Sequence, residues 1–359
     1  DLLCRPEAFD DAAVHTSTLP RRSALRVRFP PRPAPTPGQI RRAPFPRTRA
    51  EADALFSLGE PIVLEGAVLP EQLTKWSFES LEALCASDTA VADKLTSVHV
   101  ARPGVGGKIS FVDKSFKFQV MAFRELLGLA QSPGQFCYLR AIGPNPRKDR
   151  AHFWRDFGSI AEHTGFAFPA ELITPETEYF SSVLRVASKG LQLWTHYDVM
   201  HNILFQLCGR KRVVVFRPEA VAALDLSGSS SSIVDIDNLD DVDPDSPFAR
   251  ARRSAFEVDL CPGEALFMPG LWPHNARADD PSIAVNVFWR NLPAAHYGTK
   301  DLYGNRDPLL AERALALVAQ AQDVLRAAQD DGTTLPSEYV DFYSAMAAAQ
   351  LTAHLPPPH

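Results

Sequence analysis

The sequence has few cysteines and no long apolar run, and both absences narrow the class of protein. Its five cysteines are scattered among 359 residues, with no C-x-x-C pair, at Cys4, Cys85, Cys137, Cys208 and Cys261. An odd, dispersed count is typical of reduced thiols in an intracellular protein rather than of a disulfide framework. No apolar run approaches the roughly 18 residues of a transmembrane helix, and the first residues lack the charged-then-apolar order of a secretory signal. We therefore expect an intracellular protein of the cytoplasm or nucleus, with no membrane segment.

Acidic residues are missing from one stretch near the N-terminus. Between Arg21 and Arg49 there are nine arginines and no Asp or Glu, so subtracting nine positive charges from the net charge of −6 leaves −15 for the remainder. Residues 1–45 are also rich in proline, which sustains neither helix nor sheet at this density. We predict a disordered tail over 1–45. A nucleic-acid-binding arm and an organelle-targeting segment are the alternatives for so basic a composition.

From about residue 46 the pattern becomes globular and mainly β. Short apolar runs between Gly and Pro turns predict strands at 61–66, 98–100, 116–118, 136–142, 180–186, 191–198, 203–208, 212–216, 265–268 and 283–289. Gly209-Arg210 predicts a hairpin between two of these strands. So many short strands favour a sandwich or barrel over a parallel α/β sheet. Helical spacing occurs at 70–84, 309–328 and 337–351, so we divide the chain into a globular domain over 46–308 and a helical element over 309–355.

One triplet within the strand predicted at 191–198 has the residue types of a metal site. Alternate residues of a strand project from the same face, so His196 and Asp198 can point into one cavity. His274, which follows Trp272-Pro273, offers a third ligand. Two histidines and one carboxylate on one side of an ion leave the opposite positions open, as a non-haem Fe(II) requires when it binds a co-substrate and dioxygen together. Because an H-x-D triplet also arises by chance, the hypothesis depends on the residues around it.

Three further polar residues fit an anionic co-substrate beside this metal. Lys211, at the start of the strand after Gly209-Arg210, can pair with the distal carboxylate of 2-oxoglutarate. Asn202 can donate an amide hydrogen bond to a ligand carboxylate, and Asn286 is an amide in an otherwise apolar strand, where it needs partners. Each residue also has an ordinary structural alternative, namely a solvated lysine, a strand-edge amide and a hydrogen-bond anchor in the core.

Several longer runs resemble one family of oxygenases. The segments LQLWTHYDVM (191–200), GRKRVVVF (209–216) and PGEALFMPGLWPH (262–274) are similar to JmjC-domain hydroxylases, and the resemblance covers about residues 55–310. Within that family the chain is most similar to the hydroxylases of wybutosine, the hypermodified guanosine beside the anticodon of phenylalanine tRNA. The runs that carry this closer resemblance are YLR (138–140), PRKD (146–149), FSS (180–182), GLQLWTHYDVM (190–200), DIDN (235–238), ARR (251–253) and YGNRDP (303–308).

The resemblance implies a fold, a cofactor set and roles for particular residues. It implies a mainly β double-stranded β-helix (the cupin or JmjC jelly roll) with helical additions, and C-terminal helices that form a homodimer. It implies that Fe(II) is bound by His196, Asp198 and His274, and that 2-oxoglutarate, used together with O2, is bound by Tyr138, Asn202, Lys211 and Asn286. Two positions depart from the family pattern: Leu193 stands where relatives often have threonine, and His201 replaces an acidic residue.

The implied substrate is tRNA, and clustered cations are the candidates for binding its phosphates. These are Arg140, Arg147, Lys148, Arg150, Arg250, Arg252 and Arg253. A solvated charged loop is the alternative interpretation of each. A JmjC protein hydroxylase or histone-type demethylase with the same metal site is the alternative function. An idle cupin-like binding module and an RNA-binding scaffold that uses the basic tail also stay open.

Overall fold

The computed structural model describes residues 38–169, 172, 179–240, 242–330 and 337–353, and every structural statement below concerns these residues. Most of the tail predicted over 1–45 lies outside them, as does Cys4. The last part of that tail, Arg41–Pro44, forms strand β1, which pairs in parallel with β2 (Ile62–Glu65). The folded part therefore begins before residue 46, the boundary expected from the sequence.

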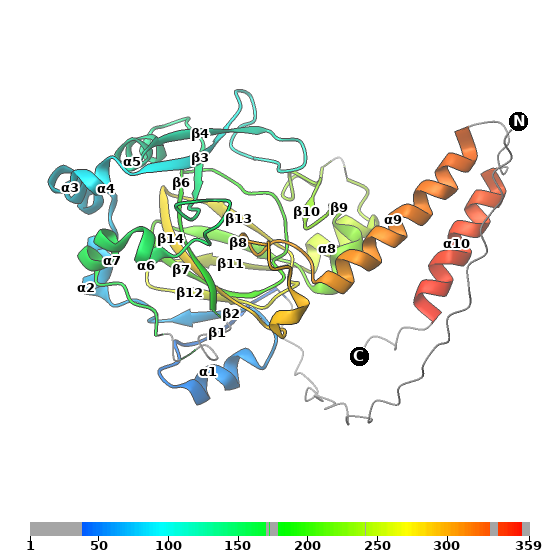
Figure 1. Cartoon of the computed structure of the whole chain (residues 1–359), viewed down its shortest axis with the longest axis horizontal. Coiled ribbons are helices and arrows are strands. Elements are labelled where there is room, and N and C mark those ends of the chain that lie inside the picture. The colour runs from blue at the N-terminus through cyan, green and yellow to red at the C-terminus, as the bar shows by residue number, and fades with distance from the viewer. Residues whose placement is uncertain (1–37, 170–171, 173–178, 241, 331–336, 354–359) are drawn as a thin grey trace, which may run out of the picture. The chain divides into compact units, whose positions relative to one another are not determined.

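A nine-stranded sheet is the larger layer of the fold (Figure 1). Its strands neighbour one another in the order β1-β2-β12-β7-β14-β6-β5-β3-β4. Beyond β1 and β2 they are β12 (Ala265–Met268), β7 (His201–Cys208), β14 (Ser282–Trp289), β6 (Tyr179–Ala187), β5 (Cys137–Arg140), β3 (Leu95–Ala101) and β4 (Phe116–Ala122). All neighbours except β1 and β2 run antiparallel, so the preference for a sandwich or barrel over a parallel sheet is confirmed.

A smaller sheet faces part of the larger one. It contains β11 (Phe256–Leu260), β8 (Lys211–Val215) and β13 (His274–Ala278), in that order and antiparallel. Val213 and Val215 of β8 share a buried apolar cluster with Val63 of β2 and Leu266 of β12. Two sheets joined by an apolar core make the jelly roll, and the predicted fold class is confirmed.

Short helices cover the other face of the large sheet, where Figure 1 shows α3 to α7 gathered beside its strands. They are α1 (Arg49–Phe56), α2 (Pro70–Leu73), α3 (Phe78–Ser87), α4 (Thr89–Ala92), α5 (Phe123–Gln131), α6 (Phe153–Asp156) and α7 (Gly158–Thr164). In α3 the spacing of Phe78, Leu81 and Cys85 places all three side chains in the buried cluster that also contains Val98 of β3. The helices therefore pack against one face of the large sheet, and the opposite face remains available to line a cavity.

The hairpin predicted at Gly209-Arg210 is wrong. β7 pairs with β12 and β14 in the large sheet, whereas β8 pairs with β11 and β13 in the small one. Gly209 has a φ of 70°, and a Cβ at this position would lie 2.2 Å from the carbonyl oxygen of Pro281. Only glycine fits this turn, which carries the chain from one sheet to the other and places Lys211 at the start of the inner strand β8.

The two helices predicted at the C-terminal end are confirmed as α9 (Leu309–Asp330) and α10 (Ser337–Ala353). They contact each other. Large apolar side chains on both are exposed, such as Leu310 at 71%, Val324 at 65% and Phe342 at 61%. Exposed apolar residues in such number are typical of a surface that binds a partner. None of the helices in the described part of the chain is both long and apolar enough to span a membrane.

Candidate metal centre

The segment that carries His196 and Asp198 is not the regular strand predicted at 191–198. It is an irregular stretch that makes isolated bridges to its neighbours, at Gln192 and His196. The backbone N–H of His196 donates to the carbonyl of His274 at 3.0 Å, and the N–H of His274 donates to the carbonyl of His196 at 2.8 Å. These two bonds hold the histidines directly opposite each other although 78 positions separate them in the sequence.

Three ligand atoms converge at this point. One nitrogen of His196, one nitrogen of His274 and a carboxylate oxygen of Asp198 all lie within 4.8 Å of one another. Nδ1 of His196 donates to the carbonyl of Trp194 at 3.0 Å, and Nδ1 of His274 donates to the carbonyl of Trp272 at 2.9 Å. A carbonyl only accepts, so both rings carry their proton on Nδ1 and present the lone pair of Nε2. The donor set suits a divalent transition metal.

Burial and hydrogen bonding hold His196 and Asp198 in the states that bind a metal. Burial, reinforced by the neighbouring His274, lowers the pKa of His196 to about 4, so its imidazole is neutral at pH 7. The Nδ2 group of Asn202 donates to a carboxylate oxygen of Asp198 at 3.2 Å. The amide of Asn286 donates in turn to Oδ1 of Asn202 at 2.9 Å. Two amides thus orient the one anionic ligand from behind.

A small inner cavity of about 50 Å³ opens beside the three ligands, and the candidate 2-oxoglutarate residues line it. Tyr138, Asn202, Lys211 and Asn286 all belong to its wall, together with His196, Asp198 and His274. Lys211 is 6% exposed and has no hydrogen-bond or ion-pair partner among the described residues. Burial and the nearby Arg185 lower the pKa of Lys211 to about 7. A buried amine without a counter-anion favours an anionic ligand in this cavity.

Arg185 is a residue of this cavity that the sequence reasoning missed. Its guanidinium hydrogen-bonds the hydroxyl of Tyr138 and the side-chain oxygen of Asn286, and no carboxylate in the described part of the chain pairs with it. It lines the inner cavity and the larger outer one as well. The signal was present, because Arg185 interrupts a strand whose other residues between 180 and 187 are buried and apolar or small.

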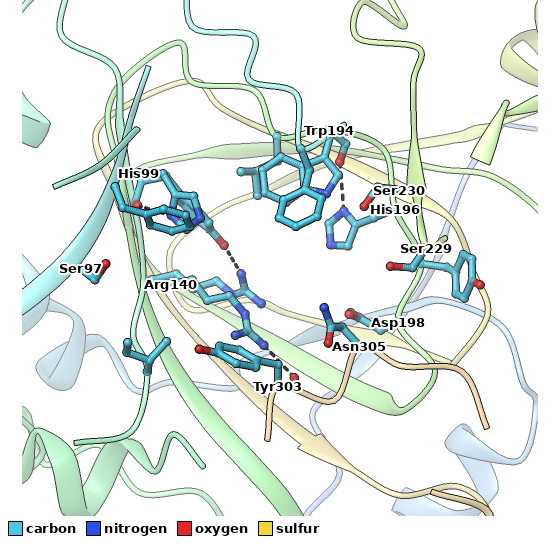
Figure 2. A pocket seen from close by; sticks show the side chains of 17 residues that line it. Ser97, His99, Arg140, Trp194, His196, Asp198, Ser229, Ser230, Tyr303 and Asn305 are labelled. Carbon is cyan, nitrogen blue, oxygen red and sulfur yellow. Dashed lines mark hydrogen bonds between the residues drawn. The ribbon is translucent and has the colours of Figure 1, made fainter. Parts of the chain in front are cut away.

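A larger outer cavity of about 370 Å³ adjoins two of the three metal ligands, His196 and Asp198 (Figure 2). Trp194 lies over His196, and the centre of the His99 ring is 6.4 Å from that of Trp194. On the wall opposite Trp194, the Arg140 guanidinium is 5.3 Å from the centre of the Tyr303 ring and donates to the Tyr303 carbonyl at 2.8 Å. The cavity is therefore walled by flat aromatic rings with two arginines, Arg140 and Arg185, among them.

The candidate phosphate-binding cations fall into three environments. Arg140 lines the outer cavity, whereas Arg147 and Lys148 are exposed in a loop nearby and Arg150 lies 4.3 Å from the centre of the Phe180 ring. The other three belong to helix α8 (Pro247–Arg253). There Arg252 forms ion pairs with Asp237 and Glu257 at 3.1 Å, while Arg250 and Arg253 donate to the carbonyls of Asp245 and Pro244. Arg252 therefore has carboxylate partners already and is the least available for a phosphate.

His201, one of the departures from the family pattern, has a structural role. Its Nδ1 accepts the backbone N–H of Gly270 at 2.9 Å. Its ring contacts Phe267 and Trp289 edge-on, and burial lowers its pKa to about 4. A neutral imidazole at this place fixes the turn that precedes His274, and His201 lines neither of the two cavities.

Comparison with known proteins agrees with this geometry. Residues 48–295 match the cupin-like domain family. The chain is 36% identical to mouse tRNA wybutosine-synthesizing protein 5, over 84% of this chain and 93% of the mouse protein. It is 40% identical to the zebrafish protein of the same name, over 81% of this chain and 85% of that one. It is also 33% identical to a quarter (25%) of tRNA wybutosine-synthesizing protein 4 of Neurospora crassa. The chain therefore belongs to the cupin-like family, in the group that includes tRNA wybutosine-synthesizing protein 5, and its predicted identity as a JmjC-type hydroxylase is confirmed.

Proposed function

We propose that this protein is an Fe(II)- and 2-oxoglutarate-dependent hydroxylase of the wybutosine-type modified guanosine of phenylalanine tRNA. The observation that carries the proposal is the position of the His196–Asp198–His274 cluster. It stands between a small cationic cavity and a larger aromatic one. A co-substrate on one side and a target base on the other would both reach the metal. The names of the related proteins supply the identity of the base.

Fe(II) would be held by Nε2 of His196, Nε2 of His274 and the carboxylate of Asp198. When bound, the iron activates dioxygen with electrons supplied by 2-oxoglutarate, so that a hydroxyl group enters an unactivated C–H bond. The chain itself fixes the two imidazole tautomers through the Trp194 and Trp272 carbonyls. It also keeps the ligands shielded, since the side chains of His274 and Asp198 are only 13% and 16% exposed. Limited access of water protects a strong oxidant from side reactions.

2-Oxoglutarate would occupy the inner cavity, whose wall includes two cations, Lys211 and Arg185, that form no ion pair among the described residues. Lys211 would pair with the distal carboxylate. Tyr138 and Asn202 would hydrogen-bond a ligand carboxylate, and Asn286 would hold Asn202 in place. Arg185 would supply further positive charge at the boundary between the two cavities. The two negative charges of the ligand would match Lys211 and Arg185, neither of which forms an ion pair with a carboxylate in the part of the chain that the structure describes.

The tRNA would approach the outer cavity. A volume of about 370 Å³ is within the range of small-molecule pockets and accommodates a large base. Single-stranded loops expose bases that stack on aromatic side chains, which is how RNA is usually read. Arg140 would contact the RNA from within the cavity, and Arg147, Lys148 and Arg150 would bind phosphates beside it. Arg250 and Arg253 of α8 would also bind phosphates, while Arg252 would act mainly through its ion pairs.

The exposed apolar surface of α9 and α10 would form a homodimer. Burying such side chains between two copies is the ordinary way to remove them from water. A protein that modifies tRNA would act inside the cell, in the cytoplasm or nucleus. Organelle targeting by the basic tail remains the alternative.

A mass measurement of tRNA nucleosides tests the proposed function. Phenylalanine tRNA that carries the unhydroxylated base is incubated with protein, Fe(II), 2-oxoglutarate and air, then digested to nucleosides. We expect the wybutosine-type nucleoside to gain the mass of one oxygen atom, with one succinate formed per hydroxylation. The matched control is His274→Ala. Hydroxylation of a histone or ribosomal-protein peptide in place of the tRNA would instead establish the alternative function, and an absence of succinate would leave a binding module.

A further inference from the structure

An aromatic wall runs from the metal ligands to the edge of the large sheet. Trp194, two residues before His196, stacks on Phe116 of β4 with ring centres 5.9 Å apart and an angle of 14° between the planes. Phe116 meets Phe118 edge-on at 5.5 Å. Phe118 in turn lies 4.6 Å from His99 of β3. Burial lowers the pKa of His99 to about 4, so its ring joins the wall as a neutral, flat surface.

The wall continues beyond the rim of the outer cavity. The register of β3 and β4 pairs His99 with Phe118, Ser97 with Val120 and Leu95 with Ala122. Ser97, His99 and Phe118 line the cavity, so alternation along the strands places Val120 and Leu95 on that same face, farther out. Phe118 is 63% exposed, Val120 65% and Leu95 72%. Phe118, Val120 and Leu95 therefore form a solvent-exposed apolar surface that continues outward from the cavity.

The opposite face of these strands is already used. Val98 of β3 and Leu139 of β5 are buried in the cluster that contains Leu126 and Leu127 of α5. Packing against α5 thus accounts for the apolar residues that point away from the cavity. It does not account for Phe118, Val120 and Leu95, which are exposed side chains on the outermost pair of strands. Exposed apolar side chains grouped beside a cavity are typical of a binding surface that continues from that cavity.

The local charge indicates what kind of ligand this is. Residues 101–120 contain four cations (Arg102, Lys108, Lys114 and Lys117) and a single acid, Asp113, on a chain whose net charge is −6. Lys108 pairs with Asp235 from outside this segment, so the local excess of positive charge comes from Arg102, Lys114 and Lys117. The Nζ of Lys114 lies 3.3 Å from the centre of the ring of Phe111, a residue that lines the outer cavity. Exposed aromatic rings with cations beside them are typical of surfaces that bind single-stranded nucleic acid.

We propose that Phe118, with Val120 and Leu95 beyond it, forms a stacking platform for the nucleotide next to the one that is hydroxylated. The inference rests on the proposed function and adds a second base-binding position to it. Side chains two apart on a strand are separated by roughly 6.6 Å. That spacing leaves room for the adjacent base to stack on Phe118 while the target base enters the cavity beside Trp194. Lys114, whose ammonium lies over the cavity-lining ring of Phe111, neutralises a phosphate of the same segment.

An extended peptide is the competing occupant, because β4 is the edge strand of the sheet and edges can add a further strand. The positive charge of residues 101–120 and the exposed ring of Phe118 favour RNA. A peptide added at the edge would depend on the backbone of β4 and would be insensitive to truncation of one side chain that points along the face.

The test uses a short RNA hairpin whose loop carries 2-aminopurine next to the target position, a base whose fluorescence falls when it stacks. The full-length protein is loaded with Mn(II) and 2-oxoglutarate so that it binds without turnover. We expect quenching with the wild-type protein, loss of quenching with Phe118→Ala, and its return with Phe118→Trp. The dissociation constant for the hairpin should rise roughly 5- to 150-fold in Phe118→Ala, the range that stacking of one base on an aromatic ring contributes. Val221→Ala, another exposed apolar residue at 45%, is the matched control and should change nothing.

Hydroxylation assays distinguish a failure of the stacking platform from a failure of the proposed tRNA hydroxylase function. In turnover, Phe118→Ala and Val120→Asp should raise KM for tRNA and leave kcat and the 2-oxoglutarate KM unchanged. Wild-type turnover with unaltered KM in both variants overturns the platform and leaves the proposed function intact. Wild-type protein that hydroxylates no RNA overturns both. Binding of peptides in preference to the hairpin, with no effect of Phe118→Ala, identifies the edge of β4 as a peptide site and overturns the platform.

Discussion

Raising the pH should weaken the binding of 2-oxoglutarate, because the cation proposed to bind it titrates near neutrality. Lys211 is 6% exposed, lies close to Arg185, and has its pKa lowered from 10.5 to about 7. Only the ammonium form attracts a carboxylate. A bound carboxylate stabilises that form and returns the pKa to its ordinary range. The affinity is therefore fully present below pH 7 and is lost as the pH rises through 7.

The size of the effect follows from the protonated fraction of Lys211. With a pKa of about 7, the apparent dissociation constant rises roughly 25-fold between pH 6.5 and pH 8.5, since each unit above the pKa removes the binding form tenfold. The assay is an anaerobic titration of the Fe(II)-loaded protein with 2-oxoglutarate, followed by the visible absorption of the iron chelate. Lys211→Arg is the control, because a guanidinium stays charged over this range and should give a flat profile. A flat profile in the wild-type protein, or an equal slope in Lys211→Arg, would refute the assignment of Lys211.

The other predictions concern the metal, the turn at Gly209 and the C-terminal helices. His196→Ala should abolish succinate formation while the far-UV circular dichroism stays unchanged; retained turnover would remove His196 from the ligand set. Gly209→Ala should lower the free energy of unfolding, measured with urea, by at least about 1–2 kcal/mol more than the control Gly228→Ala. Both glycines have positive φ, but only at Gly209 would the added Cβ meet a carbonyl oxygen, at 2.2 Å. Equal losses in the two variants would mean that the turn at Gly209 can shift. Deleting residues 309–359 should convert a dimer to a monomer in sedimentation, and a persistent dimer would place the interface elsewhere.

The metal cluster was predictable from the sequence, although one reason for expecting it was wrong. His196 and Asp198 do face one cavity together with His274, but not as alternate residues of a strand. They lie on an irregular segment that backbone bonds between His196 and His274 hold in place. Spacing along the chain indicated the right residue types. The pairing that positions them involves a segment far away in the sequence, and no local pattern reveals it.

Two other differences have the same origin. Gly209-Arg210 has the residues of a hairpin turn, yet its flanking strands enter different sheets, because turn chemistry sets the local backbone and not the partners of the strands it joins. Arg252 looks like a free cation in the sequence, but the fold brings Asp237 and Glu257 to it. Arg185 shows the reverse. A cation within a buried strand was visible in the sequence, whereas its position between two cavities depends on how β6 lies in the sheet.

The central claim is that His196, Asp198 and His274 bind one Fe(II) to which 2-oxoglutarate then adds. The most direct measurement is an anaerobic titration of the metal-free protein, first with Fe(II) and then with 2-oxoglutarate, watched for the visible charge-transfer band of the chelate. We predict a band that saturates at one iron per chain in the wild-type protein and is absent from folded His274→Ala. A folded wild-type protein that gives no band, or a band of full strength in His274→Ala, would contradict the account.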